Sequence, residues 1–175
     1  MKNVIITVSL LCSLMASAQK GKEFPKVEGV TLDEKEHQLP ISNGKISIVA
    51  VAFNKDAEDE LKEWLNPLYN TFMVKSKPAK GIDLSTNYDV NFFFVPLIAG
   101  LKIIFQKFQS TTDKAFWPYV LDTRKSDMKS VATLLGVTDR KVPYIFILDK
   151  SGKVLDFQTG EYSDDKMEAM EEAIE

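Results

Sequence analysis

The hydrophobic residues of this chain recur with two different periods, which predicts strands that alternate with helices. The unbroken apolar run over residues 46–53 has the length and β-branched content of a strand buried on both faces. After it, apolar positions return at helical spacing and predict an amphipathic helix over about 57–73, with Asp56 as its N-cap. Pro67 lies inside this helix and removes one backbone donor, so a bend is expected there. The apolar positions of the helix are Ala57, Leu61, Trp64, Leu65, Leu68 and Phe72.

The rest of the chain continues this alternation and ends in a hairpin followed by a helix. A mixed sheet with helices on both faces is therefore expected, since consecutive elements usually pack side by side. Residues 19–44 are polar and contain two prolines, which predicts an irregular N-terminal arm. The further elements expected are strands at 88–95 and 117–121, helices at 97–108 and 127–135 (ending at Gly136), a hairpin over 144–157, and a final helix capped by Ser163.

The first 18 residues have the pattern of a secretory signal. Lys2 precedes an apolar run from Val4 to Met15, and small residues follow up to Ala18. A run of about a dozen residues is short of the roughly 20 needed to span a bilayer, so cleavage after Ala18 is expected rather than a permanent anchor. Attachment of a lipid at Cys12 is not expected, because Leu11 occupies the preceding position. The predicted location is periplasmic or secreted.

Cleavage at this point would remove the single cysteine of the chain. The mature protein would then carry no thiol, with a net charge of about −4. Disulfide and thiolate chemistry would be impossible for it. The mildly acidic balance has no block of lysine or arginine, which argues against nucleic acid as a partner. No later apolar run reaches spanning length.

The C-terminal half resembles the thioredoxin-like superfamily, in particular TlpA-like thioredoxins and peroxiredoxins. The similarity is carried by Gly136-Val137, Val142-Pro143, the strand 144–148, the turn 149–153 and Gly160. It implies an α/β fold of three layers, a mixed sheet of about five strands with helices on both faces, over residues 45–175. It also implies a cis bond before Pro143.

The same resemblance locates the redox site of the superfamily and shows that it is missing. Relatives with C-x-x-C have a proline five residues after the second cysteine, so Pro67 assigns the two cysteine positions to Asp59 and Lys62. A register shifted by one residue gives Glu58 and Leu61, which are equally devoid of sulfur.

A second resemblance points to a role. Ala52-Phe53, Ala57-Glu58, Trp64, Pro67, the run 144–149 and Gly160-Glu161 are similar to the mitochondrial ATP synthase assembly-factor family, whose members are thioredoxin-like and lack the dithiol. This resemblance implies a non-catalytic chaperone that escorts a partner during assembly of a complex. The export signal of this chain leaves the identity of the client open.

The residues around Pro143 form the candidate binding site. In redox-active relatives the residues around the corresponding proline bind an extended peptide by strand-like hydrogen bonds. We therefore predict a peptide-docking rim, with the alternative that the proline only shapes the fold. The rim consists of Asp56, Asp59, Lys62, Arg140, Lys141, Val142 and Pro143.

Other chemistry-bearing residues have simpler explanations. The acids that begin the first helix favour its dipole and are not expected to act as a catalytic pair, since adjacent helical positions do not face one another. His37 is the only histidine and is expected to be solvated, so no metal site or cofactor is predicted. The aromatic groups at 92–94 and 117–119 are expected to be core, with a pocket for a small apolar ligand as the alternative.

These observations favour an exported, redox-inactive thioredoxin-like protein that binds a protein or peptide client in the cell envelope and assists folding or assembly. Two alternatives remain. One is a thiol-dependent oxidoreductase or peroxidase, which requires a thiolate nucleophile. The other is a carrier of a small apolar ligand. The sequence does not indicate the client or the oligomeric state.

Overall fold

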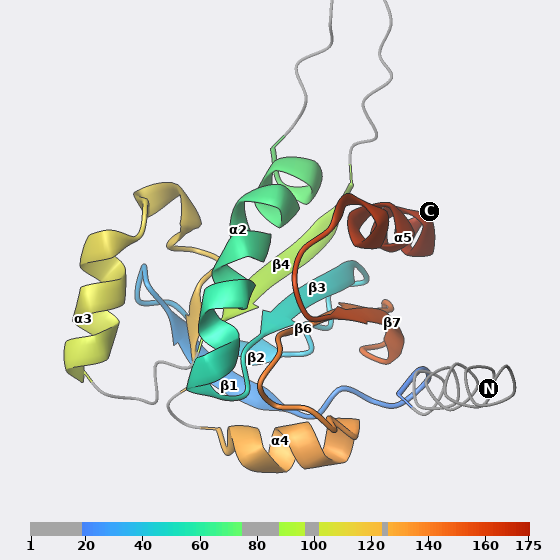
Figure 1. Cartoon of the computed structure of the whole chain (residues 1–175), viewed down its shortest axis with the longest axis horizontal. Coiled ribbons are helices and arrows are strands. Elements are labelled where there is room, and N and C mark those ends of the chain that lie inside the picture. The colour runs from blue at the N-terminus through green and yellow to red at the C-terminus, as the bar shows by residue number, and fades with distance from the viewer. Residues whose placement is uncertain (1–18, 75–87, 97–101, 124–125) are drawn as a thin grey trace, which may run out of the picture.

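The computed structural model of the chain describes residues 19–74, 88–96, 102–123 and 126–175. Its central sheet has four strands in the order β4-β3-β6-β7 (Figure 1). Strands β3 (Ile46–Val51) and β4 (Val90–Val95) are parallel. Strand β6 (Tyr144–Leu148) is antiparallel to β3, and β7 (Val154–Thr159) is antiparallel to β6. The mixed sheet predicted from the order of elements is confirmed.

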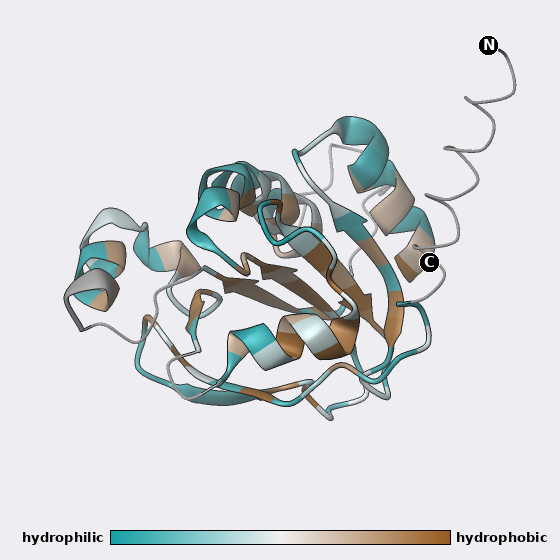
Figure 2. Cartoon of the chain, turned by 60° about the horizontal axis from the view of Figure 1, so that its bottom comes forward, coloured by the Kyte–Doolittle hydropathy of each residue, from teal (hydrophilic) through white to brown (hydrophobic). Residues whose placement is uncertain are grey.

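Helices cover both faces of this sheet and give two hydrophobic cores. The helices α2 (Glu58–Phe72), α3 (Lys102–Thr111) and α5 (Asp164–Ile174) contribute to one core, and α4 (Met128–Leu135) to the other. Successive side chains of a strand point to opposite faces, so β3 serves both cores. Ile48 and Ala50 face α2, whereas Val49 and Val51 face α4. Figure 2 shows the apolar colour concentrated on the strands and on the inner sides of the helices.

The N-terminal arm is not irregular as predicted, because it contains a hairpin. Strand β1 (Val27–Thr31) pairs with β2 (Glu36–Leu39), and β1 also pairs with β5 (Leu121–Asp122) to give a second sheet in the order β2-β1-β5. The buried positions of β1 are Val27, Gly29 and Thr31. Only one of these three is a large hydrophobic residue, so the alternation that reveals a strand is absent from the sequence.

The strand predicted at 117–121 is also displaced. A short 3-10 helix, η2 (Lys114–Phe116), and a turn precede β5, which begins at Leu121. Pro118 has no backbone N–H to donate to a ladder. Val120 forms a parallel bridge with Phe94, and this bridge joins the second sheet to the edge of the central sheet.

The ends of the helices follow the predicted chemistry with one exception. Asn54, not Asp56, caps the entrance to α2: its Oδ1 accepts hydrogen bonds from the backbone N–H of Asp56 (2.6 Å) and Ala57 (3.3 Å). A 3-10 helix, η1 (Lys55–Ala57), follows this cap and explains the shift, because it starts the helical segment one turn earlier. Ser163 caps α5, and α4 ends at Gly136, as predicted.

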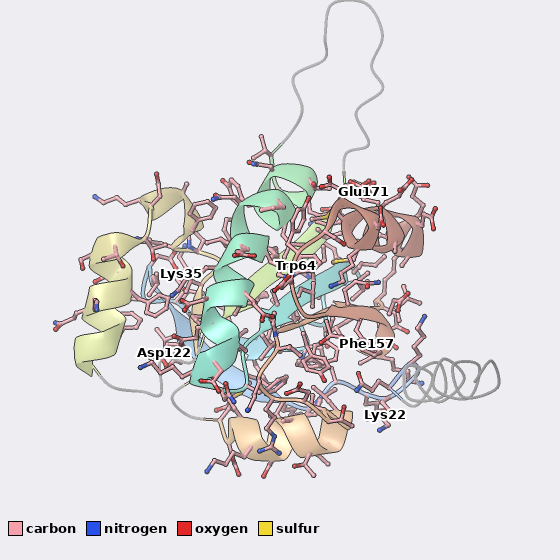
Figure 3. All side chains as sticks on the ribbon, viewed as in Figure 1. Lys22, Lys35, Trp64, Asp122, Phe157 and Glu171 are labelled. Atoms are coloured by element: carbon pink, nitrogen blue, oxygen red, sulfur yellow. The ribbon has the colours of Figure 1, made fainter. Side chains whose placement is uncertain are left out.

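Trp64 ties α2 to the end of the final hairpin. Its side chain is fully buried, and its Nε1–H donates a 2.9 Å hydrogen bond to the carbonyl of Gly160. Its ring packs edge-on against Tyr162, with centroids 5.3 Å apart. Figure 3 labels Trp64 on the side of α2 that faces α5. This bond joins two segments that are almost a hundred residues apart in the chain.

Candidate functional site

The register of the central sheet brings the two halves of the predicted rim to the same end of the fold. Val51, the last residue of β3, is paired with Tyr144, the first residue of β6. The rings of Phe53 and Tyr144 are 6.0 Å apart. The segment that starts α2 therefore begins beside the residues that precede β6, as Figure 1 also shows.

The α2 half of the rim carries an ion pair at the two positions that correspond to the dithiol of redox-active relatives. Lys62 Nζ lies 2.8 Å from Asp59 Oδ1, one helical turn away. Both side chains are exposed, at 53% for Lys62 and 94% for Asp59. The hydrogen bond from Lys62, together with its charge, lowers the pKa of Asp59. Asp56 is also exposed. This start of α2 therefore offers charge to a partner, and neither Asp59 nor Lys62 carries a thiol.

The β6 half of the rim is only partly available. Pro143 is buried, Val142 is half-buried and Lys141 is exposed. The Pro143 carbonyl accepts hydrogen bonds from Gly160 N–H (3.1 Å) and from Thr159 Oγ1 (3.0 Å), so it is already used at the end of the hairpin. Side chains that remain accessible on this half belong to the residues just before the proline.

Arg140 is directed towards α4. Its Nη2 donates hydrogen bonds to Thr133 Oγ1 (3.1 Å) and to the carbonyl of Lys129 (3.3 Å). Both acceptors belong to α4, so this guanidinium braces the helix. The structure thus brings the backbone of the two rim segments to one end of the sheet, while Arg140 engages a different element.

The cis bond expected before Pro143 is not found. Among the described residues the cis peptide bond joins Leu39 to Pro40, and the Val142–Pro143 bond is trans. An X-Pro bond has only a small intrinsic preference for one isomer, so the local sequence does not determine which is adopted.

A cleft between α2 and α3 was not predicted from the sequence. Its volume is about 710 Å³. Buried Phe94 and Val120 lie at its floor, and half-buried Leu65, Phe108 and Phe116 line it from α2, α3 and η2. Its lining comes from three separate stretches of the chain, 55–66, Phe94 and 107–120, so no single stretch reveals it. Leu65 is one signal in the sequence, because it widens the apolar stripe of α2 on this side.

Charged residues surround this apolar cleft. Three lysines and two acids line it: Lys55, Lys62, Lys107, Glu58 and Asp113. Lys62 also belongs to the predicted rim, so the cleft and the rim adjoin at the start of α2.

The other candidate residues from the sequence do not form a reactive site. His37 lies half-buried on β2, with its ring 5.2 Å from that of Phe93, so it is less solvated than predicted. In the ranges that the structure covers, no group of three or more His, Cys, Asp or Glu side chains could hold a metal ion. Phe92, Phe93 and Phe94 are all core residues. Trp117 is half-buried, and its Nε1–H donates to the carbonyl of Thr112 at 3.0 Å.

Comparison with known protein families shows the family to which this chain belongs. The family described as "ATP10 protein" matches residues 14–175, which is nearly the whole chain. This chain belongs to the ATP10 protein family. The resemblance to the ATP synthase assembly factors is therefore confirmed, and membership of this family indicates a role in assembly with a protein partner. A search of curated proteins found no match to the chain.

Solved structures confirm the thioredoxin-like fold of this member of the ATP10 family. The thioredoxin domain of a thiol-disulfide oxidoreductase from Bacteroides vulgatus is 21% identical, with a TM-score of 0.61, over 89% of this chain and 98% of that one. A putative thiol:disulfide interchange protein DsbE from Chlorobium tepidum is 18% identical, with a TM-score of 0.56, over 89% and 94%. ScoI from Arabidopsis thaliana, solved with copper bound, is 16% identical, with a TM-score of 0.55, over 86% and 96%.

The helices that the structure describes include none long and apolar enough to cross a membrane. Residues 1–18, to which the predicted export signal belongs, lie outside the described residues, as do the loop expected at 75–85 and the start of the helix expected at 97–108.

Proposed function

We propose that this protein is an exported, redox-inactive binding protein that holds a segment of a protein client and assists assembly of a complex in the cell envelope. The observation that carries this proposal is the Asp59–Lys62 ion pair at the start of α2, in a thioredoxin-like member of an assembly-factor family. A thiolate is the nucleophile of thioredoxin chemistry, and neither side chain can supply one. The rim at this end of the sheet is the proposed docking surface.

A thiol assay tests the redox-inactive part of this proposal. The purified protein is incubated with insulin and dithiothreitol, and separately with hydrogen peroxide and a thiol reductant, with a C-x-x-C thioredoxin as the positive control. Rates equal to those of the buffer blank are expected. Turnover clearly above the blank would overturn the proposal and favour an unrecognised oxidoreductase.

A pair of rim substitutions tests the binding part. Lys141→Asp combined with Val142→Asp places two carboxylates on the accessible half of the rim. Photo-cross-linking from residue 59 in cells is expected to give a discrete adduct with an envelope protein, and the double variant is expected to lose it. Lys150→Asp, in the exposed β6–β7 turn, is the matched control and should retain the adduct. An adduct that persists in the double variant would show that the rim is not the docking surface.

A further inference from the structure

Helix α2 presents one face to the sheet and a neighbouring face to the α2–α3 cleft. Leu61, Trp64 and Leu68 are fully buried against the sheet. Glu58, Lys62, Leu65 and Asn66 lie on a neighbouring face at the same helical spacing and line the α2–α3 cleft. The second face therefore forms one wall of the cleft, opposite α3 and η2.

The dimensions of the cleft match a short stretch of helix. Glu58 and Asn66 are eight residues apart, which corresponds to about 12 Å along the axis, or roughly two turns. The volume of about 710 Å³ is large enough for several apolar side chains. A docked helix would fill it with residues at positions i, i+4 and i+7, which is the usual pattern of a helix in a groove.

The charges around the cleft favour an acidic partner. The ammonium groups of Lys55 and Lys107 have no hydrogen bond or close ion pair with the part of the chain that the structure covers. Asp113 is engaged in capping η2, where its Oδ1 accepts a 2.9 Å hydrogen bond from Ala115 N–H. The lysines that line the cleft outnumber the acids, and two of the three have no close partner among the described residues. Acidic side chains beside the apolar anchors would pair with them.

We propose that the α2–α3 cleft binds one amphipathic helical segment of the client, with apolar anchors over two turns and acidic residues on its flanks. This inference rests on the proposed function, because membership of an assembly-factor family is what favours a protein segment over a free small molecule. Lys62 contributes to both surfaces, so a client held in the cleft also reaches the rim.

Two synthetic peptides test this inference directly. Both carry leucines at i, i+4 and i+7 of a helical sequence with a fluorescein label, and they differ only in flanking glutamates or flanking lysines. Fluorescence anisotropy with the purified protein is expected to give an affinity at least tenfold higher for the glutamate peptide. Phe108→Ser should weaken the binding of both peptides by removing an apolar wall. Lys55→Glu combined with Lys107→Glu should reverse the preference.

Lys150→Glu changes the net charge without touching the cleft and should leave both affinities unchanged. Circular dichroism melts establish that each variant is folded. Equal affinities for the two peptides, or no saturable binding up to millimolar concentration, would overturn the inference. A small molecule that native mass spectrometry finds retained and that displaces the glutamate peptide would also overturn it. The thiol assay and the rim substitutions do not depend on these results, so the proposed function stands or falls separately.

Discussion

Single side chains connect distant parts of this chain, and Trp64 is the clearest case. Its indole is fully buried among residues of the α2 core, while its one polar atom reaches the Gly160 carbonyl. A buried indole N–H normally requires such a partner. The side chain therefore contributes both apolar burial and a specific bond that positions the end of β7.

Trp64→Phe is expected to lower the free energy of unfolding by about 1–3 kcal/mol, because it removes the hydrogen bond and leaves the Gly160 carbonyl without that donor. Urea unfolding followed by circular dichroism measures the change. Trp117→Phe is the matched control, since it also removes an indole hydrogen bond but at a half-buried position, and it should cost less. A larger loss for Trp117→Phe would contradict this ranking.

The hydrogen bonds of Asp149 in the β6–β7 turn predict that the stability of the fold depends on pH. Its Oδ1 accepts hydrogen bonds from Ser151 Oγ (2.7 Å), Ser151 N–H (2.8 Å) and Lys153 N–H (3.0 Å), and these bonds lower its pKa, the Ser151 side chain having the largest effect. A carboxyl with a depressed folded-state pKa stabilises the fold above the unfolded pKa of about 4, and this contribution is lost as pH falls through the folded value.

Asp149→Asn should therefore reduce stability at pH 7 and flatten the acid side of the stability profile below about pH 4. Urea midpoints measured from pH 7 down to pH 2.5 for both proteins give the comparison. Parallel profiles for the two proteins would show that Asp149 does not contribute in this way.

At the scale of elements, turns and edges determine how the strands meet. Gly152 lies in the β6–β7 turn with a φ of +86°, in the left-handed region that favours glycine. A Cβ at this position would come within 2.5 Å of Pro40 Cγ, so the turn is packed directly against the end of β2. Backbone conformation and space both require glycine here.

Gly152→Ala is accordingly expected to destabilise the protein more than Gly44→Ala does. Gly44 also has a positive φ, +77°, but a Cβ there would meet nothing within 4 Å. Strain in the left-handed region costs about 1–2 kcal/mol at either site, and only Gly152 adds the clash with the proline ring. Differential scanning calorimetry of both variants tests this, and equal melting temperatures would refute the contribution of the clash.

The elements that could be predicted from the sequence are those whose own residues carry the signal. The strands at 46–51 and 144–148 are continuous apolar runs, the glycine-containing turn at 149–153 marks the hairpin, and the α2 stripe repeats at helical spacing. The β1–β2 hairpin could not be recognised, because its buried positions include Gly29 and Thr31. The α2–α3 cleft was missed for a related reason: its walls come from separate stretches that only the fold brings together.

Considered as a whole, the molecule has two hydrophobic cores that share one sheet. Each internal strand contributes side chains to both cores, so neither can come apart without loss of the strands that support the other. This coupling predicts a single cooperative unfolding transition for the whole domain.

A substitution in one core should therefore be detected in the other. Leu135→Ala, in the core beside α4, is expected to cost about 2–5 kcal/mol. In a Trp117→Phe background the intrinsic fluorescence reports Trp64, which belongs to the opposite core. The fluorescence and circular dichroism midpoints should fall together, and two separate midpoints would show that the cores unfold independently.

The short segment that precedes β1 has a consequence for solubility. Gly21 N–H donates to the Val154 carbonyl, Val154 N–H donates to the Lys22 carbonyl, and Lys20 pairs with Asp156, so this segment occupies the outer edge at the start of β7. Without it, the backbone N–H and carbonyl of Val154 would be unpaired at the edge of the sheet, where a strand from a second molecule could pair with them. A truncation beginning at residue 26 should therefore associate with rising concentration, as light scattering would detect. We therefore expect residues 20–22 to protect the protein against edge-to-edge aggregation.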